Sequence, residues 1–403
     1  MPQFSSSVNS LRSSEIRDLM SLANKPNMIL FSGGMPDNNL FPLNEIDNIF
    51  NNLTEKEKQI AMQYGPTSGI PELLGSLKEF LRKKGLPVDT NKLMITTGSL
   101  QAINILAKAF IDPEDDIIVE NPCFIGAISA FKSYQANIVS IPLTSEGIDL
   151  NKLKETLDNA KKKPKFLYIT PNFHNPAGTL YTLETKKALI KMLQGQDIPL
   201  IEDDAYSDLW YYEEDKGDLT TIKAMNPDDI DICYTGSFSK ILGPGLRLGW
   251  MLVPEHIYQK CELIKQSFDA CSPSFTQMLA HKFVESGAVY DYINNVRTEY
   301  RKRAEAMVSA LQKHLPDNIT FTIPRGGFYI WLHLPEHIDS TEVLKCAIEK
   351  GVVFVSGKTF DPHGIINNTL RLSFCNTSID KINQGIPLVA DSIKKYLENS
   401  NKK

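Results

Sequence analysis

The sequence has no long hydrophobic run, no basic tail and no paired cysteines. No window contains the roughly 18 apolar residues of a membrane helix, and the N-terminal segment has no apolar stretch of signal-peptide length. The six cysteines include no Cys-x-x-Cys pair, which argues for reduced thiols and against a zinc site or a disulfide framework. The 43 Lys and Arg residues against 48 Asp and Glu residues give a net charge of −5 without a basic stripe. We therefore expect a soluble, cytoplasmic protein with no nucleic-acid, membrane or metal partner.

The middle of the chain alternates short β-rich runs with helical patterns. The 403 residues, 42% of them hydrophobic, exceed the size at which one core usually stops growing, so two domains are expected. The alternation predicts an α/β protein with a mostly parallel sheet and crossover helices. After the first run, Ile103, Leu106, Ala107 and Phe110 recur with helical spacing, which predicts a helix with one stripe against the sheet. Seven strands are predicted, in LMITT, DIIVE, NIVSIPL, KFLYIT, PLIEDD, CYTGSF and LGWMLVP.

The two ends of the chain differ from this central part. After about Asp291 a long charged helix leads into FTIPRGGFYIWLHL, a second helix, VVFVS and TLRLSF, which predicts a smaller α+β domain. Upstream, a short amphipathic helix around residues 14–23 and the loop SGGMPDNNLFP are too small to fold alone. We predict an N-terminal segment over 1–40 with a mobile helix, a large domain over 41–290 and a small C-terminal domain over 291–403.

The strongest local signal is TGSFSKILGPGLRLGW, in which a predicted strand ends just before Lys240. A lysine there lies at the carboxyl edge of a parallel sheet, where such folds bind ligands. By residue type alone a solvated loop lysine is the simpler interpretation, because most lysines are exposed. However, Ser237, Ser239 and Arg247 bring two hydroxyls and a guanidinium near the same amine, a set that suits a phosphate. Nearby positive charge also lowers the pKa of a lysine toward that of a usable nucleophile.

A second anion site is predicted at TTGSLQAINIL, where Gly98 and Ser99 begin a helix directly after a strand. The N-terminus of a helix offers unpaired N–H groups and the positive end of the helix dipole to a phosphate. An ordinary serine N-cap is the alternative interpretation.

The segment IEDDAYSDL places Asp203 and Asp204 at a strand end, followed by Tyr206. Adjacent strand residues point to opposite faces, so only one of the two carboxylates can face a site. A carboxylate there could keep a pyridine nitrogen protonated, which is the electron sink that a pyridine cofactor needs. Helix capping and magnesium binding are the alternatives.

The segment TPNFHNPAGT carries Asn175-Pro176 after a strand, which is a candidate rigid turn with a possible cis peptide bond. Such a turn is common and carries little weight by itself. His174 is interpreted as a packing or supporting residue and not as a catalyst, because no acidic partner or nucleophile lies beside it in the sequence.

With these motifs in order, the chain resembles the class I and II aminotransferases of fold type I, and especially their 2-aminoadipate and kynurenine aminotransferase branch. The likeness covers nearly the whole chain, through SGGMPDNNLFP, MQYGPTSGIPELL, TTGSLQA, HNPAG, IEDDAY, SFSKILGPGLRLG and TLRLSF. The resemblance implies pyridoxal 5′-phosphate (PLP) as the cofactor and a homodimer with shared active sites. It also implies ping-pong transfer of an amino group from an L-amino acid to a 2-oxo acid such as 2-oxoglutarate. The implied donors are 2-aminoadipate, glutamate, and aromatic or branched-chain amino acids.

The resemblance implies roles for the matching residues toward the cofactor. Lys240 would hold PLP as a Schiff base and shuttle a proton, and Asp203 would pair with the pyridine nitrogen. Asn175 and Tyr206 would hydrogen-bond the phenolic oxygen of the ring, and Asn175 would also border the substrate. The phosphate would be held by Ser99, Ser237, Ser239, Arg247 and, from the neighbouring subunit, Tyr64.

Substrate binding is implied for Arg371, through a bidentate pair with the α-carboxylate, and for Gly34 in the Gly-rich loop. Two positions depart from the family pattern. Phe124 stands where relatives usually carry a stacking Tyr, so stacking survives without a hydroxyl. Leu100 stands where many relatives have a polar residue beside the phosphate, which leaves that contact to backbone N–H groups.

Arg17, in the N-terminal helix, would pair with the distal carboxylate of acidic substrates, although a solvated surface arginine fits the sequence equally well.

Two other functions are compatible with the same scaffold. A carbon–sulfur β-lyase uses the same lysine and aspartate but ends in elimination, so amino transfer to an added 2-oxo acid separates the two. A non-catalytic PLP-sensing domain would follow a winged-helix domain, and here only about 40 residues precede the aminotransferase-like part.

Overall fold

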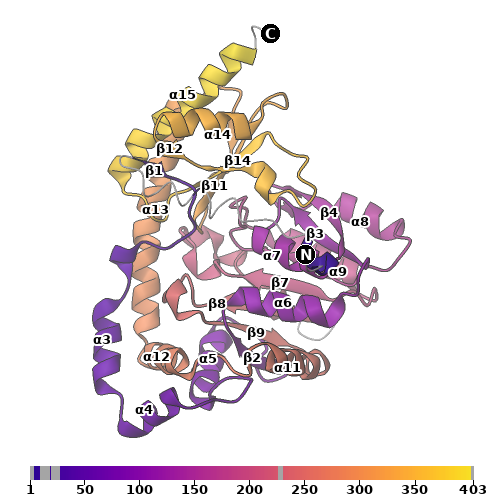
Figure 1. The fold of residues 1–403 in the computed structure, drawn as a ribbon, viewed down its shortest axis with the longest axis vertical. Helices are drawn as coiled ribbons and strands as arrows, with labels where there is room; N and C mark the ends of the chain where they lie inside the picture. Colours follow the sequence, from indigo (N-terminus) through magenta and orange to yellow (C-terminus); the bar gives the residue numbers. More distant parts are fainter. Residues whose placement is uncertain (1–3, 10–18, 20–27, 226–229, 401–403) are drawn as a thin grey trace.

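A computed structural model of the protein describes residues 4–9, 19, 28–225 and 230–400, which build two main sheets (Figure 1). The larger sheet has the strand order β2-β9-β8-β7-β6-β3-β4-β5. β9 runs antiparallel to both of its neighbours, whereas the pairs from β8 to β4 are parallel. The strands are β2 (Lys92–Thr96), β3 (Asp116–Asn121), β4 (Asn137–Thr144), β5 (Gly147–Ile148), β6 (Leu167–Ile169), β7 (Leu200–Asp204), β8 (Ile232–Ser237) and β9 (Gly249–Val253). The seven predicted strands and the mostly parallel order are confirmed, and β5 adds a two-residue eighth strand that pairs with β4.

Helices cover both faces of this sheet because its strands are apolar on both sides. In β3, Ile117 and Val119 pack into one hydrophobic cluster, and Ile118 packs into the cluster of the other face. The first cluster includes α6 (Ser99–Phe110), α7 (Ile125–Ser133) and α11 (Glu255–Asp269). The second includes α8 (Leu150–Asp158), α9 (Leu183–Leu193) and α10 (Ile222–Met225). In α6 the predicted stripe faces the sheet, since Ile103, Leu106 and Ala107 are fully buried.

The C-terminal part of the chain builds a second, antiparallel sheet of order β10-β11-β14-β13. Its strands are β10 (Thr320–Phe321), β11 (Tyr329–His333), β13 (Val355–Ser356) and β14 (Thr369–Ser373). The long charged helix predicted after Asp291 is α13 (Ala288–His314), which packs against α15 (Ile379–Ser400). In Figure 1, α13 runs from α12 (Ser274–Glu285), at the level of the larger sheet, up to the second sheet. α14 (Ser340–Glu349) packs beside α15.

The N-terminal part of the chain is joined to this second region. β1 (Ile29–Leu30) pairs in parallel with β12 (Val352–Val353). Further along, α3 (Leu43–Asn52), α4 (Glu55–Met62) and α5 (Pro71–Lys83) pack against α12. The helix predicted around residues 14–23 lies outside the described residues except for Leu19. Over the ranges that the structure describes, every helix is too short or too polar to cross a membrane.

Candidate active site

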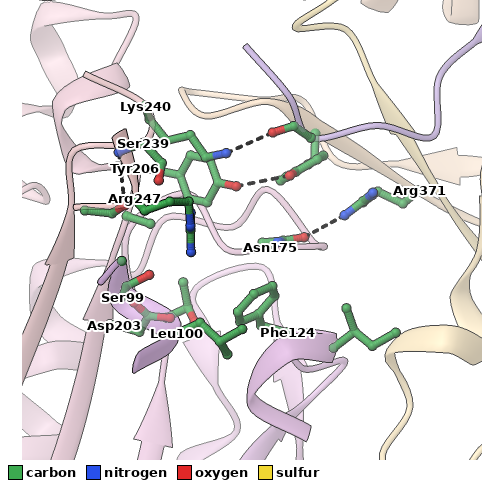
Figure 2. Close-up of a pocket in the computed structure, with 17 residues that line it drawn as sticks. Ser99, Leu100, Phe124, Asn175, Asp203, Tyr206, Ser239, Lys240, Arg247 and Arg371 are labelled. Carbon is green, nitrogen blue, oxygen red and sulfur yellow. Dashed lines mark hydrogen bonds between the residues drawn. The ribbon is translucent and has the colours of Figure 1, made fainter. Parts of the chain in front are cut away.

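A cavity of about 320 Å³ lies where the larger sheet faces the second sheet (Figure 2). Its floor comes from the carboxyl ends of β7 and β8 and from the first turns of α6 and α7. Its opposite wall comes from β11, β14 and the loop that contains Gly34. The predicted site residues that line it are Gly34, Ser99, Leu100, Phe124, Asn175, Asp203, Tyr206, Ser237, Ser239, Lys240, Arg247 and Arg371. The structure therefore brings together motifs that are spread over most of the chain.

Lys240 follows β8 by three residues, and its amine reaches into the cavity. Nζ donates a hydrogen bond to the carbonyl oxygen of Gly34 at 2.9 Å. Burial lowers the pKa of Lys240 to about 8, and the charges of Arg371 and Arg247 act in the same direction. A larger fraction of this amine is therefore neutral near physiological pH than of an exposed lysine, which suits a nucleophile.

One end of the cavity is a cradle for an anion. Gly98 has a φ of +80°, and α6 begins at Ser99 directly after it. The positive φ favours glycine here, and a β-carbon would lie 2.8 Å from Nη2 of Arg247, so the guanidinium would have to shift. The Ser239 N–H donates to Oγ of Ser237 at 3.1 Å, which places both residues in one tight turn beside the guanidinium. Hydroxyls, a helix N-terminus and a guanidinium at one place suit a phosphate.

Behind this cradle lies a support that the motifs did not reveal. Asp269, at the end of α11, accepts hydrogen bonds from Oγ1 of Thr97 at 2.9 Å and from Nε2 of Gln101 at 2.7 Å. Nζ of the buried Lys265 donates to the same carboxylate at 2.8 Å. The turn that precedes Ser99 is thus tied to a helix about 170 residues further along the chain.

Asp203 faces the cavity and its neighbour does not, as the strand alternation requires. The carboxylate of Asp203 accepts from the Tyr168 hydroxyl at 2.7 Å and from Oγ1 of Thr235 at 2.9 Å. Burial raises its pKa to about 6, although both hydrogen bonds act to lower it. Asp204 instead accepts from the hydroxyls of Tyr234 and Ser207, each at 2.7 Å, so it is a structural residue behind the strand end. A buried carboxylate with a raised pKa is suited to a cationic partner in the cavity.

Asn175 and Arg371 meet on the other side of the cavity. The Asn175-Pro176 bond is cis, as the motif suggested. Nη1 of Arg371 donates to Oδ1 of Asn175 at 2.8 Å, and Nη2 donates to the carbonyl oxygen of Ser32 at 2.7 Å. Nε of Arg371 is buried without a partner among the described residues. A buried guanidinium with an unused donor can pair with a carboxylate that enters the cavity.

His174 has an acidic partner that the sequence did not reveal. Its Nε2 lies 3.2 Å from Oε2 of Glu120, and both side chains are fully buried. The same carboxylate accepts from the Thr170 N–H at 2.8 Å and from the Tyr181 hydroxyl. Glu120 belongs to β3, 54 positions before His174 in the printed numbering, so only the pairing of β3 with β6 brings the two together. A supporting role for His174 stays a prediction; the residue is fully buried and does not line the cavity.

One predicted residue that the structure describes, Tyr64, does not line this cavity. Tyr64 is 87% exposed on the surface of this chain. Arg17 lies outside the described residues. Conversely, Ile125, Thr170 and Tyr329 line the cavity without having been predicted.

The residues present fit PLP. An amine with a lowered pKa, an anion cradle and a buried carboxylate line one cavity, and these match the aldehyde, the phosphate and the pyridine nitrogen of that cofactor. The ring of Phe124 and the Tyr206 hydroxyl border the space between them.

Comparison with known proteins agrees with this geometry. The family model for aminotransferases of class I and II matches residues 14–387. Aromatic-amino-acid aminotransferase 1 of Thermococcus litoralis is 37% identical over 98% of this chain and 95% of its own length. Pyrococcus horikoshii kynurenine aminotransferase, crystallised with PMP, has a TM-score of 0.93 at 37% identity and covers 98% of this chain and 97% of its own. The alpha-aminoadipate aminotransferase LysN of Thermus thermophilus, complexed with N-(5′-phosphopyridoxyl)-L-leucine, has a TM-score of 0.88 at 31% identity, with 98% of both chains covered. The predicted fold and cofactor are confirmed by these matches, and the chain belongs to the class I and II aminotransferases.

Proposed function

We propose that this aminotransferase moves an amino group from an L-amino acid to a 2-oxo acid with PLP held on Lys240. The observation that carries the proposal is the position of the Lys240 amine between the anion cradle, Asp203 and Arg371 in one cavity. When bound, PLP supplies an electron sink for the negative charge that develops at the α-carbon of the amino acid.

The proposed roles of the residues follow from their places. Lys240 would hold the cofactor covalently, and its amine, when free, would accept the proton from the substrate α-carbon. Asp203 keeps a positive charge on the ring nitrogen, and Tyr206 and Asn175 donate hydrogen bonds to the phenolic oxygen. Phe124 would stack on the ring. The phosphate would be held by Ser99, Ser237, Ser239, Arg247 and the backbone at Leu100.

Substrate selection is assigned to the second-sheet side of the cavity. Arg371 binds the α-carboxylate, which all amino donors share, so it does not select among them. Gly34 on this side lines the cavity, and Ile125 at the start of α7 lines it from the floor; we assign both to the donor side chain. The donors that we propose are 2-aminoadipate, glutamate, and aromatic or branched-chain amino acids, with 2-oxoglutarate as an acceptor. The named relatives, which act on aromatic amino acids, kynurenine and aminoadipate, support this range.

We also propose that the active unit is a homodimer. Large apolar side chains are exposed on α3, α4, α12 and the turn after α4, namely Leu43, Phe50, Met62, Tyr64 and Phe275. An apolar surface of this kind is typical of an interface with a second copy. Tyr64 would then reach the phosphate of the partner subunit. A cytoplasmic location and the division into 1–40, 41–290 and 291–403 are part of the same proposal.

The test is chemical labelling of the lysine. Borohydride reduction of the purified protein with PLP, followed by peptide mapping, should place the label on Lys240. Lys240→Ala should lose turnover while it still binds PLP without a covalent bond, and the surface variant Lys92→Ala should keep both. A label on another lysine would overturn the assignment. Release of ammonia and a 2-oxo acid without any need for an amino acceptor would favour a β-lyase.

A further inference from the structure

Tyr329 lines the cavity from the side opposite Asp203, and no motif assigned a role to it. It is the first residue of β11 in the second sheet, and 2% of its surface is exposed. Its hydroxyl oxygen lies 3.0 Å from that of Tyr206, which follows β7 of the larger sheet; this is the dashed line that leaves Tyr206 in Figure 2. The two hydroxyls thus link the two sheets beside the Lys240 amine.

The ring of Tyr329 also supports Arg371. The guanidinium carbon lies 4.3 Å from the centroid of the Tyr329 ring and 4.8 Å from that of Phe360. A planar guanidinium is held well by aromatic faces, which restrict the direction of its N–H groups. Loss of the Tyr329 ring would therefore loosen Arg371, whereas loss of the hydroxyl alone would not.

The hydroxyl end of Tyr329 lies against the Gly34 backbone. A β-carbon at Gly34 would overlap the Tyr329 hydroxyl oxygen. The Gly34 carbonyl accepts from Nζ of Lys240. Tyr329 therefore contacts three groups that face the cavity: the Tyr206 hydroxyl, the Arg371 guanidinium and the Gly34 loop.

Either hydroxyl of the pair can donate to the other, and the charge beside them favours one direction. Burial raises the pKa of both Tyr206 and Tyr329, so both keep their protons at neutral pH. In such a pair one hydroxyl donates, and the one that accepts keeps its own proton for another acceptor. The charge of Arg371 lies over the Tyr329 ring and polarises its O–H bond, which favours Tyr329 as the donor. A hydroxyl that accepts one hydrogen bond becomes a stronger donor in the next.

We propose that Tyr329 is a positioning residue, whose hydroxyl donates to Tyr206 so that the Tyr206 O–H points into the cavity, and whose ring fixes the plane of Arg371. This inference rests on the proposed function, in which Tyr206 donates to the phenolic oxygen of PLP and Arg371 binds the substrate carboxylate.

Two substitutions separate the hydroxyl from the ring. Tyr329→Phe removes only the hydroxyl, and the visible absorbance of bound PLP is then titrated with pH. A hydrogen bond donated to the phenolic oxygen of PLP favours the deprotonated form of the cofactor. Weaker donation in Tyr329→Phe should therefore raise the midpoint of the absorbance titration by about half a pH unit. Tyr206→Phe should raise the titration midpoint further. Adding Tyr329→Phe to Tyr206→Phe should change the midpoint no more, because the two hydroxyls act through one hydrogen bond.

The ring is tested by steady-state kinetics. Tyr329→Leu should raise the KM for the amino donor about tenfold, with kcat changed less, whereas Tyr329→Phe should leave KM within about twofold.

The outcomes distinguish this inference from the proposed function. If Tyr206→Phe moves the midpoint and Tyr329→Phe does not, or if Tyr329→Phe moves it equally without the Tyr206 hydroxyl, the positioning role is overturned while the cofactor assignment stands. If the wild-type protein with PLP shows no visible absorbance that borohydride removes, the proposed function itself fails. Thermal melting of each variant shows whether a shift reflects lost folding, and a shift that follows lost folding would count against the positioning role.

Discussion

Nη1 of Arg371 donates a 2.8 Å hydrogen bond to Oδ1 of Asn175, and this bond spans the two sheets across the cavity. Arg371 lies in the middle of β14, and Asn175 lies in the loop after β6. The proposed carboxylate site is therefore oriented by a residue that also borders the cofactor space. Under the proposed roles, substrate binding and the placement of the cofactor ring would both depend on this one contact between the two parts of the chain.

Asp203→Asn should stabilise the cofactor-free protein near neutral pH. Burial raises the pKa of Asp203 from 3.8 to about 6, so between these pH values the folded protein binds more protons than the unfolded chain. The stability of the wild type should therefore fall as pH rises through this window and stay lower above it. The uncharged amide avoids this loss, which is at most about 3 kcal/mol. Melting temperatures of the two cofactor-free proteins should converge near pH 4 and separate above pH 6.

The same variant should bind PLP and transfer amino groups slowly, because an amide cannot hold a positive charge on the ring nitrogen. The loss of a charged hydrogen bond predicts a rate lower by about 10- to 100-fold. Asp204→Asn is the matched control, since its carboxylate binds Tyr234 and Ser207 behind the strand. It should lower stability and retain transfer in the folded fraction. Slow transfer in Asp204→Asn with a normal rate in Asp203→Asn would contradict the assignment.

Gly34→Ala should impair substrate binding far more than Gly33→Ala. A β-carbon at Gly34 would overlap the Tyr329 hydroxyl, whereas at Gly33 it would meet nothing within 4 Å. Displacement of Tyr329 should raise the KM for amino donors about tenfold or more, while Gly33→Ala stays within about twofold. Steady-state kinetics of both variants measure this difference. The double change Gly34→Ala with Tyr329→Phe removes the overlapping oxygen and should recover part of the loss, and no recovery would place the defect elsewhere.

Tyr64→Phe should weaken PLP binding through the partner subunit. The residue is 87% exposed on a single chain, so its proposed contact exists only in the dimer. Mixing Tyr64→Phe with Lys240→Ala chains tests this directly. In a mixed dimer one site combines an intact Lys240 with the Tyr64 of the partner subunit, so a class of sites with wild-type PLP affinity should appear. If no such class forms, or if sedimentation shows an active monomer, the shared-site proposal is wrong.

Arg17→Ala should lower activity on glutamate or 2-aminoadipate more than on leucine. Arg17 itself lies outside the described residues, but Leu19, two positions later, packs against the cluster of Trp331 and Phe360 that adjoins Arg371. A guanidinium in this part of the chain can pair with a distal carboxylate, which predicts a difference of about 1–3 kcal/mol in transition-state binding. The measurement is kcat/KM for each donor, with Arg12→Ala as the control. Equal losses on acidic and apolar donors would assign Arg17 to the fold or to the shared α-carboxylate.

Local patterns in the sequence determined the sheet and much of the site. Alternation along β7 predicts that only one of Asp203 and Asp204 faces the cavity, because strand side chains alternate with a period of two. The alternation of strands and helices predicts a mostly parallel sheet, so Lys240 is expected at its carboxyl edge, where such folds bind ligands. Such features depend on neighbours within a few residues of one another, and a sequence displays them directly.

Other features were decided only by the tertiary structure. The Tyr206–Tyr329 pair joins residues 123 positions apart, and the Glu120–Tyr181 pair joins residues 61 apart. Neither partner carries a local pattern that identifies the other, because a buried phenol is compatible with many packings. Their meeting depends on how the second sheet lies against the first and on which strands pair. Arg371 shows the same limit. The resemblance implies a guanidinium for a carboxylate, but only the packing of β14 against the loop after β6 and beside β11 provides Asn175 and Tyr329 to orient it.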